Sequence, residues 1–193
     1  MSRASEMQKR KLQIIDAAMD VLLEDGFCDL RLSQVAKHAG VSAGLVCHHY
    51  GTKQGLLLAV MRHAVSAYQS QSEKVIAANP VARDQIFAIV RLALVPEQSS
   101  ARLSAVWLAL YYLSSSDLTY RTELLRYQQQ NYENILSALS PLYDAQKAQY
   151  KARVIAAMID GVWLQNAVHC ETVDLVAAQE LAVSLAEHVL TVP

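Results

Sequence analysis

Residues that interrupt helices are scarce in this chain. Its 193 residues include only six glycines and four prolines, whereas alanine, leucine, glutamine and glutamate are abundant. Glycine and proline are the least favourable residues inside a helix, and the four abundant residues are among the most favourable. Beyond Pro80 no segment shows the strict apolar-polar alternation of a half-buried strand. The sequence therefore predicts an all-α protein, and its apolar share of 53% is sufficient for a packed core.

Cysteines and long apolar runs are also few. The three cysteines, Cys28, Cys47 and Cys170, are odd in number and widely spaced, so they indicate neither a disulfide framework nor a zinc site. The polar N-terminus lacks the apolar segment of a signal peptide. The longest apolar run, residues 154–164, contains Asp160 and is too short to cross a bilayer. We therefore expect a cytoplasmic protein with no membrane partner.

A strong net charge is absent as well, since the formal net charge is −1. The distribution of charge is uneven, however. Residues 1–63 contain eight Lys and Arg against six Asp and Glu, together with four of the six histidines. The rest of the chain contains nine Lys and Arg against twelve Asp and Glu. A mildly basic N-terminal part on a mildly acidic remainder suits contact with DNA at one end of the molecule.

Apolar residues at helical spacing, separated by turn-forming residues, predict about nine helices. We place them at residues 7–24, 32–39, 42–49, 53–78, 81–94, 99–115, 118–139, 144–169 and 172–190. Gly26 is expected to end the first helix, Thr52 to cap the fourth, and Asn79-Pro80 to stop it. The expected organisation is a three-helix domain at 1–52, a connector helix at 53–79, and a helical body at 80–193.

Residues 32–50 have the pattern of a helix-turn-helix that enters DNA. Gly40 supplies the positive φ of the turn, and Ser42 caps the helix that follows it. The apolar inner faces, the small crossing residue and the corner are expected at Val35, Ala36, Ala39, Val41 and Val46. An ordinary helical hairpin would keep the same glycine and apolar positions, so it stays open as the alternative.

The second helix of this motif presents candidates for reading DNA. Side chains that project outward into the major groove are expected at Ser42, Ala43, Gly44, Leu45 and His48. His48 can bond to guanine, and Ala43 or Leu45 can touch a thymine methyl group. Phosphates at the groove edges are expected to meet Arg31, His49 and Lys53. For His48 the alternative is a solvated surface histidine.

With these features the chain resembles the TetR family of bacterial repressors. The matching residue types are Gly26-Phe27, Val35-Ala36, Ala39-Gly40-Val41-Ser42, Gly44, His48, Tyr50, Lys53 and Leu56-Leu57. The resemblance implies a homodimer whose two heads bind a pseudo-palindromic operator and release it when a small molecule binds the helical body. Arg31 and His49 depart from the threonine and tyrosine that are common in the family. Asp29 is therefore expected to help cap the first motif helix, while Tyr50 matches a buried family position.

Within that family the choline-responsive repressors are the closer likeness, on residues 41–50, 53–57, 105–110 and 158–164. The body also gathers aromatic residues near one carboxylate: Trp107, Tyr111, Tyr127, Trp163 and Asp160, with Glu97 as a second candidate counter-charge. Aromatic faces and a carboxylate are what a quaternary ammonium ion such as choline needs. The alternatives are a purely structural aromatic core in which Asp160 pairs with Arg153, or a pocket for a different hydrophobic or aromatic small molecule.

The last two predicted helices favour a dimer. Residues 154–168 are apolar nearly all round, and Ala156, Ala157 and Gly161 permit close helix contact. One stripe of the final helix carries Leu175, Ala178, Ala182, Leu185 and Val189. Two such helices from each subunit can form a four-helix interface about a two-fold axis. The alternative is that both helices simply belong to the monomer core.

Motifs of enzymes and metal sites are missing. The chain contains no nucleophile elbow, no phosphate-binding glycine loop and no HExxH sequence. Cys47, His48 and His49 are adjacent on a helix and point in different directions, and His169-Cys170-Glu171 is expected to be a helix-end loop. We therefore expect no enzyme, cofactor or metal. A helical scaffold that binds other proteins is the remaining class, and the basic N-terminal part argues against it.

Overall fold

The computed structural model describes residues 3–168 and 174–192, and this part of the chain forms nine α-helices and no strand. The all-α prediction is confirmed. The helices are α1 (Arg3–Asp29), α2 (Leu32–His38), α3 (Ala43–Tyr50), α4 (Lys53–Ala78), α5 (Ala82–Leu92), α6 (Ala101–Ser114), α7 (Leu118–Leu139), α8 (Ala145–Val168) and α9 (Leu175–Thr191).

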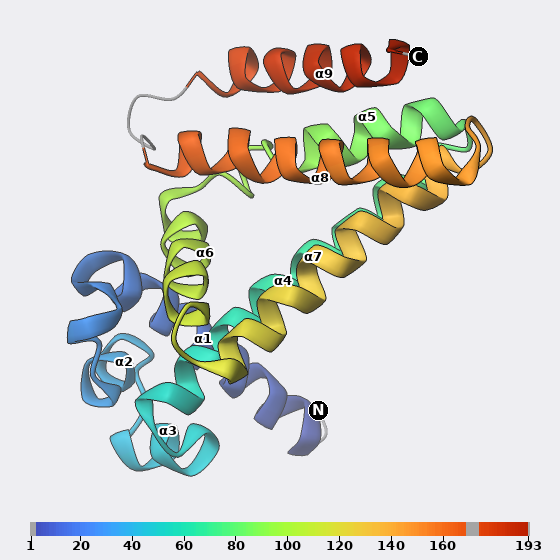
Figure 1. Ribbon diagram of the computed structural model, residues 1–193. Helices are drawn as coiled ribbons and strands as arrows, with labels where there is room; N and C mark the ends of the chain where they lie inside the picture. The colour runs from blue at the N-terminus through green and yellow to red at the C-terminus, as the bar shows by residue number, and fades with distance from the viewer. Residues whose placement is uncertain (1–2, 169–173, 193) are drawn as a thin grey trace.

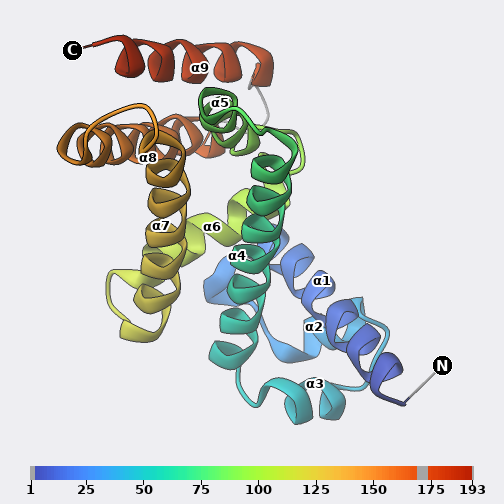
Figure 2. The same ribbon diagram turned by 90° about the vertical axis from the view of Figure 1, so that its right-hand side faces the viewer.

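The helices are arranged with a small head at one end and a larger body at the other (Figure 1). Helices α1, α2 and α3 form the head, and α4 runs from the head deep into the body. Figure 2 shows α9 at the opposite end of the molecule from α3, beyond α5 and α8. Helix α6 packs against α1 as well as against α4 and α7, so it joins the head to the body.

Helices α4 and α7 have the predicted bounds, and a side chain caps the start of each. The hydroxyl of Thr52 accepts from the Gly55 amide, and the carboxylate of Asp117 accepts from the Thr119 amide. The predicted ends of α8 and α9 at residues 169 and 172, and the loop that contains Cys170, lie outside the described residues.

The first helical segment differs from the prediction at its start, and Gly26 interrupts it as predicted. The segment begins at Arg3, and Gly26 has φ 73° and ψ 169°, outside the helical region. One more helical turn follows this kink and reaches Asp29, so α1 consists of two helices that meet at Gly26. The ring of Phe27 in that turn packs against α6, where its centroid lies 5.0 Å from that of Tyr112. The prediction that Gly26 ends the first helix is therefore confirmed, and the extra turn after it was not predicted.

One apolar core runs through the whole described molecule. It is a single cluster of buried side chains to which every helix contributes, from Ile14, Val35 and Val46 in the head to Ile155 and Ala178 in the body. Such continuity means that the head cannot shift relative to the body without repacking side chains between them. The fold therefore provides a mechanical connection between its two ends.

A lysine of α8 is buried against the end of α9. Lys151 is only 2% exposed, and its Nζ donates hydrogen bonds to the carbonyl oxygens of Val189, at 2.5 Å, and Val192, at 2.7 Å. The same Nζ lies 4.9 Å from the centroid of the Tyr143 ring. Carbonyl groups at a helix C-terminus carry partial negative charge, so they attract the ammonium group. Lys151 therefore attaches the last turn of α9 to α8.

Apolar side chains remain exposed along α8 and α9. Leu164 and Val168 of α8 are 45% and 62% exposed, and Leu181 of α9 is 50% exposed. Within the subunit the predicted stripe of α9 is divided: Ala178 and Ala182 are buried together with Ala186 and Leu190, whereas Leu185 stays exposed. The two helices therefore contribute to the monomer core with one face and leave another apolar face without a partner within the described chain.

No helix within residues 3–168 and 174–192 combines the length and the hydropathy that crossing a bilayer requires.

Candidate functional site

The turn between α2 and α3 has the geometry that the sequence predicted. Gly40 has φ 62°, in the left-handed region that favours glycine, and the Val41 amide donates to the Ala36 carbonyl at 3.0 Å. The side chain of Ser42 accepts from the Leu45 amide at 3.2 Å, so it caps α3. Val46 is fully buried. These contacts confirm a helix-turn-helix held by its own apolar corner.

The start of α2 is capped differently from the prediction. Arg31 occupies the N-cap position but makes no capping hydrogen bond with its side chain. The side-chain oxygen of Gln34 accepts from the Arg31 amide at 2.9 Å, and the Gln34 amide group donates to Asp25 at 2.9 Å. The expected help from Asp29 is thus replaced by Gln34, which Asp25 orients. In this arrangement the guanidinium group of Arg31 does not cap the helix, and Arg31 is exposed.

The outer surface of α3 is open to solvent. Ser42, Ala43, Gly44 and His48 are exposed, and Leu45 is half-buried. Small residues at the start of α3 leave its backbone uncovered, so a nucleic-acid groove can approach closely. Figure 1 shows α3 at one end of the molecule, with the body on the other side of the head. All the residues that the sequence analysis singled out for base reading therefore lie on one accessible helix.

The expected phosphate contacts lie around the same helix but differ in their surroundings. The Nζ of Lys53 donates to the Cys28 carbonyl oxygen at 2.5 Å, which places its ammonium group between α4 and the end of α1. The imidazole of His49 is half-buried. Burial, followed by the charges of His48 and Lys11, lowers the pKa of His49. Protonation of His49 is therefore disfavoured in the free protein, and an approaching anion would favour it.

Tyr50 is a packing residue, in agreement with its expected role. Its ring packs against the apolar core, and its hydroxyl donates to the Lys11 carbonyl oxygen at 3.0 Å. Burial raises the pKa of Tyr50, so the hydroxyl keeps its proton and its donor function. The contact attaches α3 to α1.

Sequence reasoning missed the importance of Gly55. A Cβ atom at this position would lie 2.2 Å from the Tyr50 carbonyl oxygen, at the end of α3. Only glycine lets the first turn of α4 pass so close to that carbonyl. Gly55 therefore fixes the spacing between the recognition helix and the long helix that leads into the body.

A cavity in the body is lined largely by aromatic residues. The side chains that line it are Tyr68, Ala93, Gln98, Trp107, Tyr111, Tyr127, Asp160 and Trp163. The ring centroids of Trp107 and Tyr127 are 4.6 Å apart, and the rings of Tyr111 and Trp163 are stacked with centroids 6.2 Å apart. The four aromatic residues that the sequence analysis selected are thus brought together beside Asp160.

The cavity is narrow. About 300 Å³ of its space is free of protein atoms when its mouth is included, and the centroids of neighbouring rings in its lining are 4.6 to 6.5 Å apart. The aromatic rings therefore lie almost in contact with one another across it. The rings belong to α4, α6, α7 and α8, so a ligand that spread them would act on four helices.

Among the described residues, Asp160 is the one acidic side chain that lines this cavity. Its carboxylate accepts from the Tyr127 hydroxyl at 3.3 Å. Burial raises the pKa of the Asp160 carboxyl, whereas hydrogen bonds from Tyr111, Tyr127 and Gln128 partly oppose the rise. Within the described residues no ion pair joins Asp160 to Arg153, which had been its alternative partner, or to any other cation. The carboxylate is held by neutral donors and is available to a cation.

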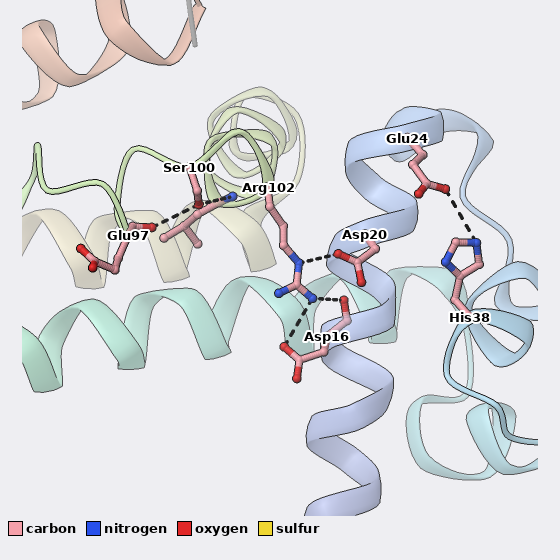
Figure 3. Close-up of polar contacts among 8 residues, drawn as sticks. Asp16, Asp20, Glu24, His38, Glu97, Ser100 and Arg102 are labelled. Carbon is pink, nitrogen blue, oxygen red and sulfur yellow. Dashed lines mark hydrogen bonds and ion pairs between the residues drawn. The ribbon is translucent and has the colours of Figure 1, made fainter. Parts of the chain in front are cut away.

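The second candidate counter-charge lies elsewhere. Glu97 is exposed and is absent from the cavity lining, and Figure 3 shows its carboxylate directed away from Arg102 and Ser100. The neighbouring residue, Gln98, is 4% exposed and lines the cavity instead. The expectation for Glu97 is corrected accordingly. Tyr68 of α4 is a lining residue that the sequence analysis did not select, because nothing in its local pattern shows that α4 passes beside α7.

Helix α6 connects the cavity to the head. Its side chains Trp107 and Tyr111 line the cavity, while Arg102, in its first turn, reaches α1. The Nε of Arg102 lies 2.7 Å from Asp20, and its Nη2 contacts both the carboxylate and the carbonyl oxygen of Asp16 (Figure 3). The contacts of Arg102 therefore join α6 directly to α1.

Among the described residues no group of three or more His, Cys, Asp and Glu side chains is placed to hold a metal ion.

The fold and these two sites together define a class of protein: a helix-turn-helix transcriptional regulator of the bacterial TetR type, with a reading head and a ligand-binding body. Residues 14–60 match the model of the bacterial regulatory proteins of the tetR family. Residues 82–191 match the model of the C-terminal domain of BetI-type transcriptional repressors. The chain belongs to the BetI-type branch of the TetR family, and it is a ligand-responsive, DNA-binding transcriptional repressor.

Relatives of similar length support this assignment. The HTH-type transcriptional regulator BetI of Paraburkholderia xenovorans is 33% identical over 178 residues, covering 90% of this chain and 89% of the relative. BetI of Burkholderia ambifaria is 32% identical over 187 residues, covering 94% of each chain.

Solved structures show the same fold. A transcriptional regulator from Pseudomonas aeruginosa has a TM-score of 0.82 and 21% identity, over 95% of this chain and 91% of that one. A regulator from Saccharomonospora viridis, solved in complex with choline, has a TM-score of 0.78 and 20% identity, over 94% of this chain and 97% of that one.

Proposed function

We propose that this repressor senses a small quaternary ammonium compound, with choline as the first candidate, and releases its operator when the compound occupies the aromatic cavity. A quaternary ammonium ion cannot donate ordinary hydrogen bonds, so aromatic faces and a counter-charge have to hold it. The cavity offers five aromatic side chains and one carboxylate.

The observation that carries the proposal is the state of Asp160. A carboxylate in a partly desolvated, aromatic environment is costly unless it is paired. Within the described residues Asp160 has only neutral donors, and the pKa of its carboxyl is raised by burial. A bound cation would supply the missing charge. The choline complex of the Saccharomonospora viridis regulator and the BetI names of the curated relatives agree with this ligand class.

Calorimetry can separate the contribution of the ligand's positive charge from the contribution of its shape. We expect choline and betaine aldehyde to bind, and the uncharged isostere of choline, in which carbon replaces the quaternary nitrogen, to bind at least about tenfold more weakly. Equal binding of the isostere would overturn the cation site. It would favour the alternative, a TetR-type regulator of an efflux or catabolic operon that senses a hydrophobic or aromatic molecule, which the predominantly aromatic lining also suits.

For DNA, we propose that the exposed side of α3 reads the bases through Ser42, Ala43, Gly44, Leu45 and His48. Arg31, His49 and Lys53 would bind the adjacent phosphates. The exposure of α3 and its position at the end of the head support this assignment. His48 is the one long polar side chain on that surface able to bond to guanine N7 or O6.

A gel-shift assay on the promoter region of the protein's own gene tests this assignment. His48→Ala should reduce the preference for the operator over random DNA by about five- to fiftyfold, while binding to random DNA stays the same. A variant that binds both DNAs as the native chain does would show that His48 is merely a solvated surface residue. If the native protein showed no specific binding to this DNA, the result would favour the alternative of a helical scaffold that binds other proteins.

We propose a homodimer in which α8 and α9 of each subunit form a four-helix interface. The exposed apolar side chains of these helices, including Leu164, Val168 and Leu181, support this arrangement. Two heads would then bind successive major grooves of a pseudo-palindromic operator. The corresponding division of the chain is a DNA-binding domain at 1–52, a connector helix at 53–79, and a ligand-binding and dimerisation domain at 80–193. Chromosomal operator DNA would place the dimer in the cytoplasm.

A further inference from the structure

The first turns of α1 carry a cluster of basic side chains without counter-charges. Lys9 and Arg10 are exposed, and Lys11 is half-buried. None of the three forms an ion pair within the described residues, and Glu6, one turn before Arg10, is not paired with it. Residues 5–10 are all exposed, and none of them belongs to the apolar core. We call Lys9, Arg10 and Lys11 the α1 basic cluster.

Two hydrogen bonds hold the adjoining part of α1 against the helix-turn-helix. The Nε2 of Gln13 donates to the carbonyl oxygen of Ala39, in the turn between α2 and α3, at 2.7 Å. The Tyr50 hydroxyl, at the end of α3, donates to the Lys11 carbonyl oxygen at 3.0 Å. Lys9 is four residues before Gln13, so both side chains lie on the same side of α1. The α1 basic cluster therefore begins where the packing of α1 on the helix-turn-helix ends.

The α1 basic cluster continues the positively charged surface around α3. Figures 1 and 2 both place the first turns of α1 at the same end of the molecule as α3. The charge of Lys11 acts on His49 there, because it lowers the pKa of His49 as the third cause, after burial and the charge of His48. No aspartate or glutamate occurs from residue 30 to residue 72. Neither α2 nor α3 therefore has an acidic residue that would weaken the positive field between α3 and the α1 basic cluster.

We infer that the α1 basic cluster is a second DNA contact, which binds backbone phosphates next to those bound around α3, whatever the base sequence. Exposed Lys and Arg side chains suit phosphate oxygens, and contacts of this kind position a protein on DNA without reading bases. The position of Lys11 beside His49 makes the two contact surfaces continuous, which favours DNA over an acidic protein surface as the partner. The inference rests on the proposed role of α3 in DNA binding, and it lengthens the stretch of DNA that each head covers.

The salt dependence of DNA binding tests the α1 basic cluster. Lys9→Gln combined with Arg10→Gln removes two positive charges and no intramolecular ion pair. Each lost phosphate contact lowers the slope of log affinity against log salt by about 0.9, so we expect a fall of about 1.8 for each bound head. Lys11→Gln alone should lower the slope by about 0.9.

Fluorescence anisotropy on two labelled duplexes measures these slopes. One duplex is the promoter region of the protein's own gene, and the other is a random sequence of the same length. The fall should be equal on both duplexes, because phosphates carry no sequence information, and the preference for the promoter region should change by less than about twofold. A loss confined to the promoter duplex would overturn the inference, since it would show that these side chains read bases.

Lys74→Gln combined with Lys147→Gln is the matched control. It also removes two exposed positive charges, but from the body, on α4 and α8, so it should leave the slope unchanged. An equal fall in the control would overturn the α1 contact, because the slope would then follow net charge. Equal slopes for the native protein and the α1 double variant would also overturn it and leave DNA binding by α3 intact. If the native protein bound neither duplex, the proposed role of α3 would itself be wrong.

Discussion

Asp160 in the body is expected to favour the binding of a cation and to lower the free energy of unfolding of the free protein. Asp160 is held among aromatic rings, and burial raises the pKa of its carboxyl. A raised pKa in the folded state means that the ionised form is less favourable there than in the unfolded chain. The resulting loss of stability is fully present above the folded-state pKa, and it disappears as the pH falls to the ordinary value for aspartate.

Asp160→Asn should therefore stabilise the free protein while weakening its response to cations. We expect the free energy of unfolding at neutral pH to rise by about 0.5–1 kcal/mol, because an amide has no charge to desolvate. The gain should shrink as the pH falls toward about 4, the ordinary pKa of aspartate, because the raised pKa lets the native carboxyl take up a proton before the unfolded chain does. Denaturant unfolding across this pH range measures the difference. A destabilised Asp160→Asn protein would show that the carboxylate is an ordinary structural group.

In the head, the role of Lys53 can be measured by the salt dependence of DNA binding. Each phosphate contact that is removed lowers the slope of log affinity against log salt by about 0.9. Lys53→Ala should lower the slope by about that amount, and Gln54→Ala, an exposed neighbour without charge, should not change it. Lys53 also donates to the Cys28 carbonyl oxygen, and loss of this hydrogen bond affects the fold of the head. The salt slope is therefore a better measure of the phosphate contact than the affinity. Equal slopes for the native protein and Lys53→Ala would remove Lys53 from the phosphate contacts.

Local spacing predicted some of the cavity residues but not others. Trp107 and Tyr111 are four residues apart, and Asp160 and Trp163 are three apart, so each pair shares a helix face wherever the helix packs. Tyr68 lines the cavity only because α4 crosses beside α7, which is a tertiary property. The sequence analysis selected Glu97, but the neighbouring side chain of Gln98 lines the cavity. Periodicity cannot show which way side chains point in a short irregular segment.

Among the helices, α4 and α6 both connect the cavity to the head. Helix α4 carries Lys53 at its start and Tyr68 in the cavity lining. Helix α6 contributes two aromatic side chains to the cavity and the Arg102 contacts to α1. A ligand changes DNA affinity only if it acts differently on two arrangements of the protein. A ligand that spread the aromatic rings would act on α6, so this helix is positioned to carry that displacement to the head.

Arg102→Ala should weaken this coupling without destroying either site. We expect choline affinity to change by less than about twofold, and the choline-induced loss of operator affinity to fall by about three- to tenfold. Fluorescence anisotropy of a labelled operator with and without choline measures the effect. Arg83→Ala is the control, since it breaks another exposed ion pair, with Glu187, between α5 and α9. The same response in both variants would show that the Arg102 contacts do not transmit the signal.

Capping residues explain why some helices were predicted accurately. Thr52 and Asp117 have side chains that bond to the amides of the first turn, and such signals are local. The start of α2 has no such residue at position 31, and the pair that replaces it, Gln34 with Asp25, spans nine residues and two helices. Caps that depend on tertiary contacts lie beyond local sequence patterns.

At the scale of the whole molecule, dimerisation determines whether two heads can bind one operator. Leu164→Glu combined with Leu181→Glu should yield monomers in analytical ultracentrifugation, because charges replace apolar contacts at the proposed interface. Operator affinity should fall by at least about a hundredfold, since the second head no longer binds at high effective concentration. Leu118→Glu, at an exposed site at the start of α7, is the control and should remain dimeric. Dimers of the double variant that retain affinity would place the interface elsewhere.

The sequence predicted the existence of α8 and α9 better than it predicted which of their faces pack within the subunit. The apolar composition of residues 154–168 predicted a helix covered on more than one side, and this stays a prediction, because Leu164 and Val168 are exposed within the described chain. On α9 the stripe that included Leu185 is partly solvent-exposed. Periodicity identifies apolar faces, and it cannot tell which face meets the same subunit. Ala186 and Leu190 meet α5 and α8 because of how the body packs, not because they are more apolar than Leu185.

The Lys151 contacts bear on how this protein can be shortened or tagged. The ammonium group depends on carbonyl oxygens supplied by residues 189 and 192. Truncation of the chain just before residue 189 would leave the ammonium group of Lys151 buried without these acceptors, next to the Tyr143 ring. Proteolysis at this end would thus destabilise the packing of α8 and α9, the helices that we expect to form the interface between two subunits. A purification handle is better attached near Arg3, at the other extremity, with its effect on DNA binding checked separately.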